Sequence, residues 1–441
     1  MRRILLATAL LVALVPAWGA PPIPPYYTEV PSPLDLRGAI GYALDHNYAI
    51  LQAREAVRLQ EGVIIQVSSP RIPNVSASGQ WQRNSTAISQ VYPAADEQWG
   101  VSLKATQTLY AGGGVNSSIK GAKLTRDAAA YDLQTAIDTA LLDVRTKFYN
   151  VLLAKGRIKV QEENVQLYQH QLDDTKNQFD VGTVSNFEVL RARVSLANAQ
   201  PGLITARNSY RIAIEQLRQS LGAPVSSSFP DVTGDLEFQT QEFDLNSAIA
   251  SAHEHRPEIL KLQKLEGAGE QSVTTARSAL YPNLQAFAGY QWDGYTYADS
   301  SLGNANANGW LFGLQSTWSI FDGRATEGRV RQAKSQLEQA RLSTATEELE
   351  VDVEVRQSMS TLQEAGELVN ASRQTVDQAA EALRLADAKF HAGSATQLDV
   401  LTSQVSLTQS RTDQLTANYN YLVALANVRK AIGLSDALVT P

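Results

Sequence analysis

The sequence predicts an α+β membrane protein in which each chain contributes four β-strands and long antiparallel helices that arise from a tandem duplication. Three observations support this fold class. The chain matches itself once along its length, and four short segments alternate polar and apolar residues. Long stretches without proline follow the second and the fourth of these segments, as helices of unusual length would require.

The N-terminal segment has the features of a signal peptide. Arg2 and Arg3 precede an apolar stretch at 4–15, which is shorter than the roughly 20 residues that a membrane-spanning helix needs. We expect residues 1–19 to be removed, with cleavage after Gly19 or Ala17. No later stretch reaches about 18 apolar residues, so no transmembrane helix is expected. An exported chain without cysteine is expected in a bacterial envelope.

Composition excludes several classes of function. The chain has no cysteine, so a thiolate metal site, a disulfide scaffold and a cysteine nucleophile are ruled out. It carries 38 basic and 45 acidic residues, which gives a formal net charge of −7. A nucleic-acid-binding protein needs a basic face, so no nucleic-acid partner is expected.

The chain repeats itself once. Residues 34–51 match 243–260, and residues 178–200 match 389–411, in the same order and at nearly the same spacing. Such regularity indicates a tandem duplication rather than several unrelated domains. The predicted division is a first repeat at 20–222, a linker at 223–242, a second repeat at 243–433 and a C-terminal tail at 434–441.

Each repeat is predicted to contain two strands, at about 73–82 and 98–110 and at about 281–292 and 308–320. One face of these segments is apolar, the other carries Ser, Thr, Asn and Gln, and Lys104 is their only charged residue. A soluble sandwich would carry Lys and Glu on its wet face, whereas uncharged strands with aromatic ends are typical of a membrane β-barrel. The predicted aromatic girdle consists of Trp81, Trp99, Trp292, Trp310 and Trp318.

Long helices are predicted after each strand pair. Residues 114–180 and 325–391 contain no proline, and each stretch would be about 100 Å long as a continuous helix. Second helices are expected at about 186–221 and 396–432, and Pro201 is expected to kink or interrupt the first of them. The recurrence of apolar and small residues at helical spacing suits coiled-coil packing.

Four strands in one chain cannot close a barrel, and open strand edges are not tolerated in lipid. Two copies would supply eight strands and three copies would supply twelve. The chain is therefore expected to oligomerise. The product would be a wet pore in the membrane, coaxial with a helical tube outside it.

Three local motifs add to the duplication. Each repeat opens its first strand with Pro-Asn, at Pro73-Asn74 and Pro282-Asn283. The strand-to-helix turns read QTLYAGGG at 107–114 and STWSIFDGR at 316–324, and the hairpin tips fall at 178–192 and 389–403. Together these features resemble the TolC-type outer-membrane efflux proteins over nearly all of the mature chain.

The resemblance implies a homotrimer in the outer membrane of a Gram-negative-type bacterium. Its 12-stranded β-barrel would lie in outer-membrane lipid and continue as a 12-helix periplasmic tunnel. The implied function is passive export of small molecules that an inner-membrane transporter passes on through a periplasmic adaptor. A duct for type I protein secretion or for metal-ion efflux is an alternative within this class. A trimeric coiled-coil structural or adhesive envelope protein is the alternative from another class.

The hairpin tips, near residues 182 and 393, are the first candidate site. The end of each helix needs a left-handed residue, a conformation that glycine adopts at little cost. The resemblance implies that the tips dock the adaptor. The residues assigned to this surface are Gly182, Thr183, Val184, Ser185, Gly393, Ser394, Ala395 and Thr396.

A gate just past the tips is the second candidate site. The resemblance implies rings of aspartate that constrict the tunnel, and Asp399 matches the first such position. Thr402 stands where a second aspartate often lies, Ala395 where an arginine latch can sit, and Glu188 is the matching acid of the first repeat. The alternative interpretation of Asp399 and Glu188 is helix stabilisation, because acids in a first helical turn are favourable anyway.

No catalytic, cofactor or metal site is predicted, and the chain is not expected to be an enzyme. His253 and His255 are two residues apart, a spacing that points their rings to different sides of a helix and suits a solvated face better than a metal site. The nucleophile-elbow, P-loop and dinucleotide motifs do not occur in the sequence. An envelope hydrolase is therefore only a distant alternative.

The connections between paired strands, at 84–97 and 293–307, should face the cell exterior. They are rich in small and polar residues, and the first absorbs the two-residue change in the spacing of the repeats. We expect epitope tags inserted near Ser85 or Asn304 to be tolerated and to bind antibody on whole cells. Binding only after the outer membrane is broken would reverse the predicted orientation.

Overall fold

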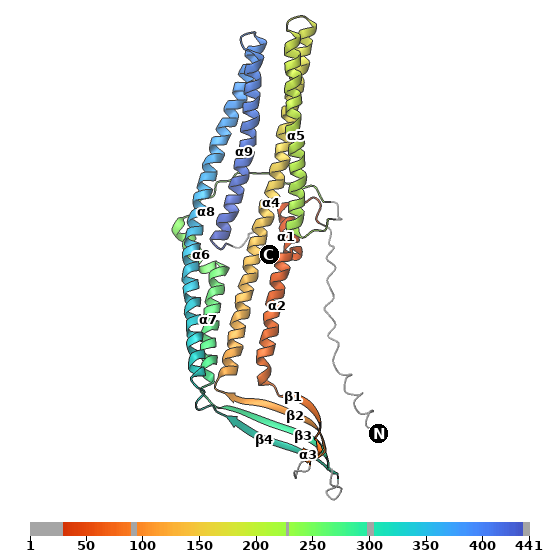
Figure 1. Ribbon diagram of the computed structural model, residues 1–441. Coiled ribbons are helices and arrows are strands. Elements are labelled where there is room, and N and C mark those ends of the chain that lie inside the picture. Colours follow the sequence, from red (N-terminus) through yellow and green to blue (C-terminus); the bar gives the residue numbers. More distant parts are fainter. Residues whose placement is uncertain (1–29, 90–94, 226–228, 298–303, 435–441) are drawn as a thin grey trace.

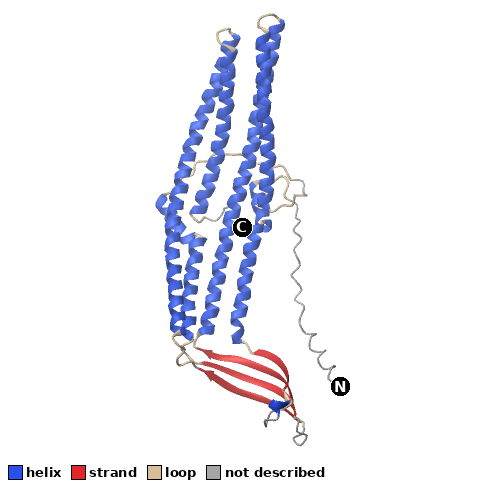
Figure 2. Ribbon diagram, in the orientation of Figure 1, coloured by secondary structure: helices blue, strands red, loops and turns tan. Residues whose placement is uncertain are grey.

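The computed structural model describes residues 30–89, 95–225, 229–297 and 304–434. The predicted signal peptide at 1–19 lies outside these residues, as does nearly all of the predicted tail at 434–441. The described part of the chain is a long rod of helices with a curved sheet at one end (Figure 1, Figure 2). Within it, no helix is both long enough and apolar enough to cross a bilayer.

The sheet is antiparallel and has the strand order β1-β2-β3-β4. Its strands are β1 (Asn74–Arg83), β2 (Glu97–Ala111), β3 (Asn283–Thr296) and β4 (Ala305–Thr317). Because the order is sequential, β2 and β3 join the two repeats in the middle, and β1 and β4 form the two edges. A short helix, α3 (Thr86–Ser89), lies in the connection between β1 and β2.

Two details of the sheet differ from the expectation. β3 continues to Thr296 and β4 begins at Ala305, so seven residues of the predicted loop at 293–307 are strand. β4 ends at Thr317, so Trp318 lies beyond it. There the indole Nε1 of Trp318 donates to the carbonyl of Leu280 over 3.1 Å. That bond ties the strand-to-helix turn of the second repeat to the end of the preceding helix.

The strand register places the tryptophans on one face of the sheet. Trp81 lies opposite Trp99, and Trp310 lies opposite Tyr290, so these pairs share a face. All five predicted girdle residues are exposed, with exposed fractions from 41% for Trp292 to 73% for Trp310. An apolar surface of this size needs a covering other than water.

The opposite face of the sheet is polar. The hydroxyls of Ser78 and Ser102 lie 2.8 Å apart across β1 and β2, and Gln98 donates to the side chain of Gln82 over 3.0 Å. The sheet thus has one apolar face and one face lined mainly by uncharged hydrogen-bonding groups, which is the division that a water-filled barrel in lipid requires.

The helices of the two repeats correspond one to one. In the first repeat they are α1 (Leu36–His46), α2 (Tyr48–Ser68), α4 (Gly114–Asp180) and α5 (Asn186–Leu221), with a short 3-10 helix η1 (Ser69–Arg71) before β1. In the second they are α6 (Leu245–His255), α7 (Pro257–Ser278), α8 (Ala325–His391) and α9 (Gln397–Ala431). Asp35 and Asp244 cap α1 and α6 in the same way, through a carboxylate oxygen that accepts a backbone N–H three residues on.

The two longest helices run the full length of the rod. α4 and α8 each have 67 residues, which corresponds to about 100 Å. Near the sheet they pack with α2 and α7, and beyond the middle of the rod they pack with α5 and α9 (Figure 1). Each level of the described rod is therefore crossed by four helices.

α5 is continuous through Pro201, so the expected interruption is wrong. The reason is packing against α4. Alanines recur every seventh residue on the buried side of α5, at Ala192, Ala199, Ala206 and Ala213. This small-residue heptad lets the two helices approach closely over the whole hairpin, and that contact outweighs one lost backbone hydrogen bond.

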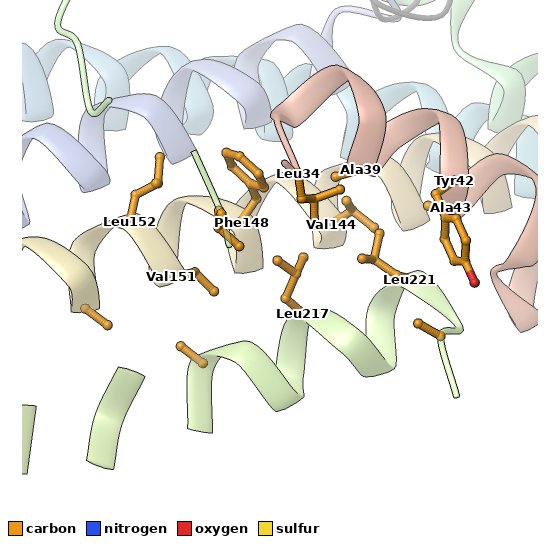
Figure 3. Close-up of a cluster of buried hydrophobic side chains, with 14 residues drawn as sticks. Leu34, Ala39, Tyr42, Ala43, Val144, Phe148, Val151, Leu152, Leu217 and Leu221 are labelled. Carbon is orange, nitrogen blue, oxygen red and sulfur yellow. The ribbon is translucent and has the colours of Figure 1, made fainter. Parts of the chain in front are cut away.

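Two hydrophobic clusters mark the middle of the rod, one in each repeat. The first gathers side chains of α1, α4 and the end of α5, including Tyr42, Phe148 and Leu217 (Figure 3). The second gathers side chains of α6, α8 and α9, including Ile259 of neighbouring α7, Val355 and Tyr421. We call them the first core and the second core.

The predicted linker connects these two cores. Val232 is fully buried in the first core, where it forms a parallel bridge with Leu34. Leu236 also packs against the first core, whereas Phe238 packs edge-on against Tyr421 of the second core, with ring centroids 4.5 Å apart. We call residues 229–241 the strap, because this segment crosses from one core to the other within three residues.

The hydroxyl of Tyr421 clamps the strap. It donates to the carbonyl of Gln239 over 2.9 Å and accepts the backbone N–H of Gln241 over 3.0 Å.

We expect Tyr421→Phe to lower the free energy of unfolding by about 1 kcal/mol, because two backbone groups lose their partner. Denaturant titration of the purified protein in detergent measures this change. Tyr48→Phe is the control, since Tyr48 is 64% exposed, and an equal loss in both variants would contradict the clamp.

Candidate functional site

The hairpin tips lie at the end of the rod opposite the sheet (Figure 1). Gly182 and Gly393 have φ values of +80° and +73°, and both tips close with the same pair of backbone hydrogen bonds. In the first, Gly182 N–H donates to Phe179 and Thr183 N–H to Gln178; in the second, the corresponding donors are Gly393 and Ser394. A side chain other than hydrogen would strain both turns.

The second tip starts its next helix with a capping box that the first tip lacks. Thr396 caps α9, and one carboxylate oxygen of Asp399 accepts both the backbone N–H and the hydroxyl of Thr396, at 2.8 and 2.7 Å. At the first tip, Ser185 precedes α5 without a side-chain cap. Hydrogen bonds from the Thr396 hydroxyl and backbone hold the pKa of Asp399 below its ordinary value, so the carboxylate is charged at neutral pH.

The other predicted gate residues are engaged within their own helices. The hydroxyl of Thr402 donates to the carbonyl of Leu398 over 2.8 Å. Glu188 lies 3.9 Å from Arg191, one helical turn away, and both side chains are one-third exposed. Asp399 is thus a helix cap within one chain, and its role in a gate stays a prediction, as do those of Glu188 and Thr402.

The tips differ in surface chemistry, a difference that the sequence analysis missed. Around the first tip Phe179, Val181 and Phe187 are exposed, Val181 by 75%. The second tip instead exposes Lys389 and His391 beside its turn, with Leu398 as its nearest exposed large apolar residue. An alignment of the two repeats could have predicted this difference in apolar character. Val181 aligns with Ala392 of the second repeat, and Phe187 aligns with Leu398.

A polar seam joins the two hairpins within the chain, between α4 and α9. Near the tips, buried Gln397 donates to the hydroxyl of Thr175 over 3.4 Å. Farther from the tips the contacts pair Thr408 with Asn164 at 3.0 Å, Arg411 with Glu163 at 2.8 Å and Arg157 with Thr416 at 3.1 Å. The seam could not be predicted from the sequence, because its partners lie more than 200 residues apart.

His253 is partly exposed to solvent and also contacts a neighbouring helix. Its Nε2 lies 2.7 Å from a carboxylate oxygen of Asp352, so it joins α6 to α8. His255 turns away, and its Nδ1 lies 3.0 Å from the carbonyl of Ser251 in its own helix. Among the described residues, no group of three or more histidines or acids is arranged to hold a metal ion.

Known proteins resemble this chain over both repeats. A family model described as outer membrane efflux protein matches residues 39–223 and 248–434. The outer membrane protein TolC of Escherichia coli K12 is 25% identical over 317 residues, which cover 68% of this chain and 62% of that protein. The cobalt-zinc-cadmium resistance protein CzcC of Cupriavidus metallidurans is 25% identical over 429 residues, which cover 93% of this chain and 94% of that protein.

The fold is also that of a solved outer membrane protein. The crystal structure of VceC from Vibrio cholerae matches with a TM-score of 0.74 at 18% identity, and the match covers 90% of this chain and 96% of that chain. The likeness extends over the sheet and the helices, so the whole described architecture has a precedent.

The two interpretations of Asp399 can be separated by a pair of substitutions. Asp399→Asn removes the charge but keeps an oxygen that can accept from Thr396. Thr396→Ala removes most of the cap but keeps the charge. If three carboxylates face one pore, Asp399→Asn should reduce cation selectivity and block by trivalent cations in planar bilayers, whereas Thr396→Ala should preserve both. Loss in Thr396→Ala alone would return Asp399 to a capping role.

The pH dependence of this selectivity follows from the lowered pKa of Asp399. The folded-state pKa is depressed, so the charge persists when the pH falls to the ordinary aspartate value of about 3.9 and disappears only below it. The cation preference of the wild-type channel should follow the same course. A loss centred well above that value would assign the preference to other groups.

Proposed function

Because this chain belongs to the outer membrane efflux protein family, we propose that three copies of it form the outer-membrane duct of a tripartite efflux system. The duct is passive, and it releases small molecules that an inner-membrane transporter delivers through a periplasmic adaptor. The barrel lies in the outer membrane of a Gram-negative-type bacterium, and the helices extend into the periplasm.

One observation supports this proposal above all others. The sheet has two unpaired edges and exposes its tryptophan-bearing face, yet backbone groups at an open edge have no partner in lipid. Only closure with further copies satisfies both features. A coiled-coil structural or adhesive protein would have no use for such a face, so this alternative is disfavoured.

A trimer accounts for an open barrel and a continuous tunnel better than a dimer does. Eight strands enclose little more than their own side chains, whereas a wider barrel leaves an aqueous channel. Each chain supplies four strands to the sheet and four helices at every level of the described rod. Three chains therefore supply twelve strands and twelve helices, so that the barrel can continue into a tunnel with the same number of wall elements.

The side of the chain that carries β1 and the side that carries β4 both expose apolar residues that could pack against each other. The side that carries β1 exposes Leu59 and Ile65 of α2 and Ile204 of α5, whereas the side that carries β4 exposes Leu349 and Val353 of α8. A head-to-tail contact between unlike sides closes a ring when the rotation per subunit divides the circle. The exposed apolar residues would be covered in that ring.

The tips are proposed as the docking surface for the adaptor. They are the part of the chain farthest from the sheet, and the first tip exposes Phe179, Val181 and Phe187 to solvent. Such a cluster is typical of a protein contact site. Export of polypeptides or of metal ions stays an alternative within the same architecture.

Assembly is the direct test. We expect the protein extracted in mild detergent to be a trimer by native mass measurement and by cross-linking. Leu349→Lys should weaken the trimer, because it places a charge on a side chain that is 68% exposed in the single chain and covered in the ring. A monomer or dimer from intact membranes would contradict the proposal.

A further inference from the structure

Lys104 is an unusual residue for its position. It lies in the middle of β2, on the polar face of the sheet, directly opposite Gly289 of β3. Of the strand residues, only Arg83, Glu97, Lys104 and Asp293 are charged, and Arg83 and Glu97 pair with each other at the strand ends. Within the described part of the chain, Lys104 makes no ion pair, and its side chain is exposed.

The sheet holds the ammonium group of Lys104 against an aromatic ring. Its Nζ lies 4.9 Å from the centroid of the Phe287 ring, within the range of a cation–π contact. Phe287 is an aromatic exception on a face of Ser, Thr, Asn and Gln. The contact keeps the charge near the wall without neutralising it.

Two glycines flank this pair. A Cβ on Gly313, opposite Phe287, would lie 2.8 Å from the tip of the Phe287 ring, so the glycine leaves space for the ring to lie across β4. A Cβ on Gly289, opposite Lys104, would lie 2.7 Å from the carbonyl oxygen of Leu103, so the glycine allows β2 and β3 to approach closely beside Lys104.

We propose that Lys104 is a charge-selecting residue of the barrel lumen. This inference rests on the proposed function, because the polar face becomes the inner wall only when three chains close the barrel. Three Lys104 ammonium groups then form a ring at mid-height, each backed by Phe287. The ring favours anionic solutes and disfavours cations on their way out.

The ring has an acidic counterpart nearer the outer end of the barrel. Asp293 shares the polar face, opposite Gly100 and four residues from Gly289, which is about 13 Å along the strand. Gln291 donates to its carboxylate over 3.1 Å. The wall thus carries one charge of each sign at separate heights, and the two charges should act on permeating ions in opposite directions.

Planar bilayer recordings under a salt gradient test the inference. The first variant is Lys104→Met, which keeps an apolar stem and removes the charge. In about 0.01 M salt the Debye length is about 30 Å, so wall charges act across the lumen. We expect the cation-to-anion permeability ratio to rise about fourfold or more, because the loss of even one unit charge about 10 Å from an ion in water changes the entry of cations and of anions about twofold in opposite directions. The change should shrink in about 1 M salt, where the Debye length is about 3 Å.

Three further variants complete the design. Asp293→Asn should lower the same ratio, because it removes the charge of opposite sign. Ser102→Ala changes an uncharged residue of the same face and should leave the ratio unaltered. Lys104→Gln repeats the neutralisation with a side chain that this face already carries, in case the methionine variant does not assemble.

The outcomes distinguish a failure of the proposed function from a failure of the role inferred for Lys104. A wild-type protein that forms no conducting trimer would overturn the proposed function. Conducting trimers of Lys104→Met or Lys104→Gln with an unchanged ratio in low salt would overturn the inference and leave the proposed function standing. A rise in both variants together with a fall in Asp293→Asn would place Lys104 on the inner wall as a selecting charge.

Discussion

The structure depends on one constraint, which is that every backbone N–H and C=O group in a lipid environment needs a partner within the protein. One chain leaves the outer sides of β1 and β4 without partners. The sequential strand order carries those edges to opposite sides of the chain, and the helices on each side expose apolar residues. In the proposed trimer, the chain is a section of the wall that becomes complete beside another copy.

Duplication gives this wall two kinds of joint. The joint inside the chain, between α4 and α9, is largely polar and includes Gln397 with Thr175 and Arg411 with Glu163. The sides that would meet between chains expose Leu, Ile and Val among their polar residues. A polar joint that is already held by the strap can exchange its hydrogen bonds with water at little cost. An apolar joint between separate chains has to supply the free energy of association.

The features that follow local periodicity could be predicted from the sequence. The alternation of apolar and polar residues predicted the strands, and the tryptophans predicted their apolar face. Features that depend on distant partners could not be predicted. Pro201 was expected to kink or interrupt α5, and the heptad of buried alanines that keeps the helix continuous was not recognised. The seam and the strap pair residues such as Leu34 and Val232, which no local pattern connects. The hydroxyl of Thr402 could not be placed either, since its choice of acceptor depends on a rotamer.

The strap also has a consequence for the order in which the chain folds. The first core contains Leu34 from one end of the first repeat and Val232, which follows α5, and both are fully buried. A chain that is exported from its N-terminus cannot close this core until residue 232 has crossed the inner membrane. By then the whole first hairpin has emerged with its core open, so the first repeat closes only after the strap has followed it. Export from the N-terminus therefore delays closure of the first core until the strap has crossed, and the apolar face of the sheet, which also needs β3 and β4, stays incomplete for longer still.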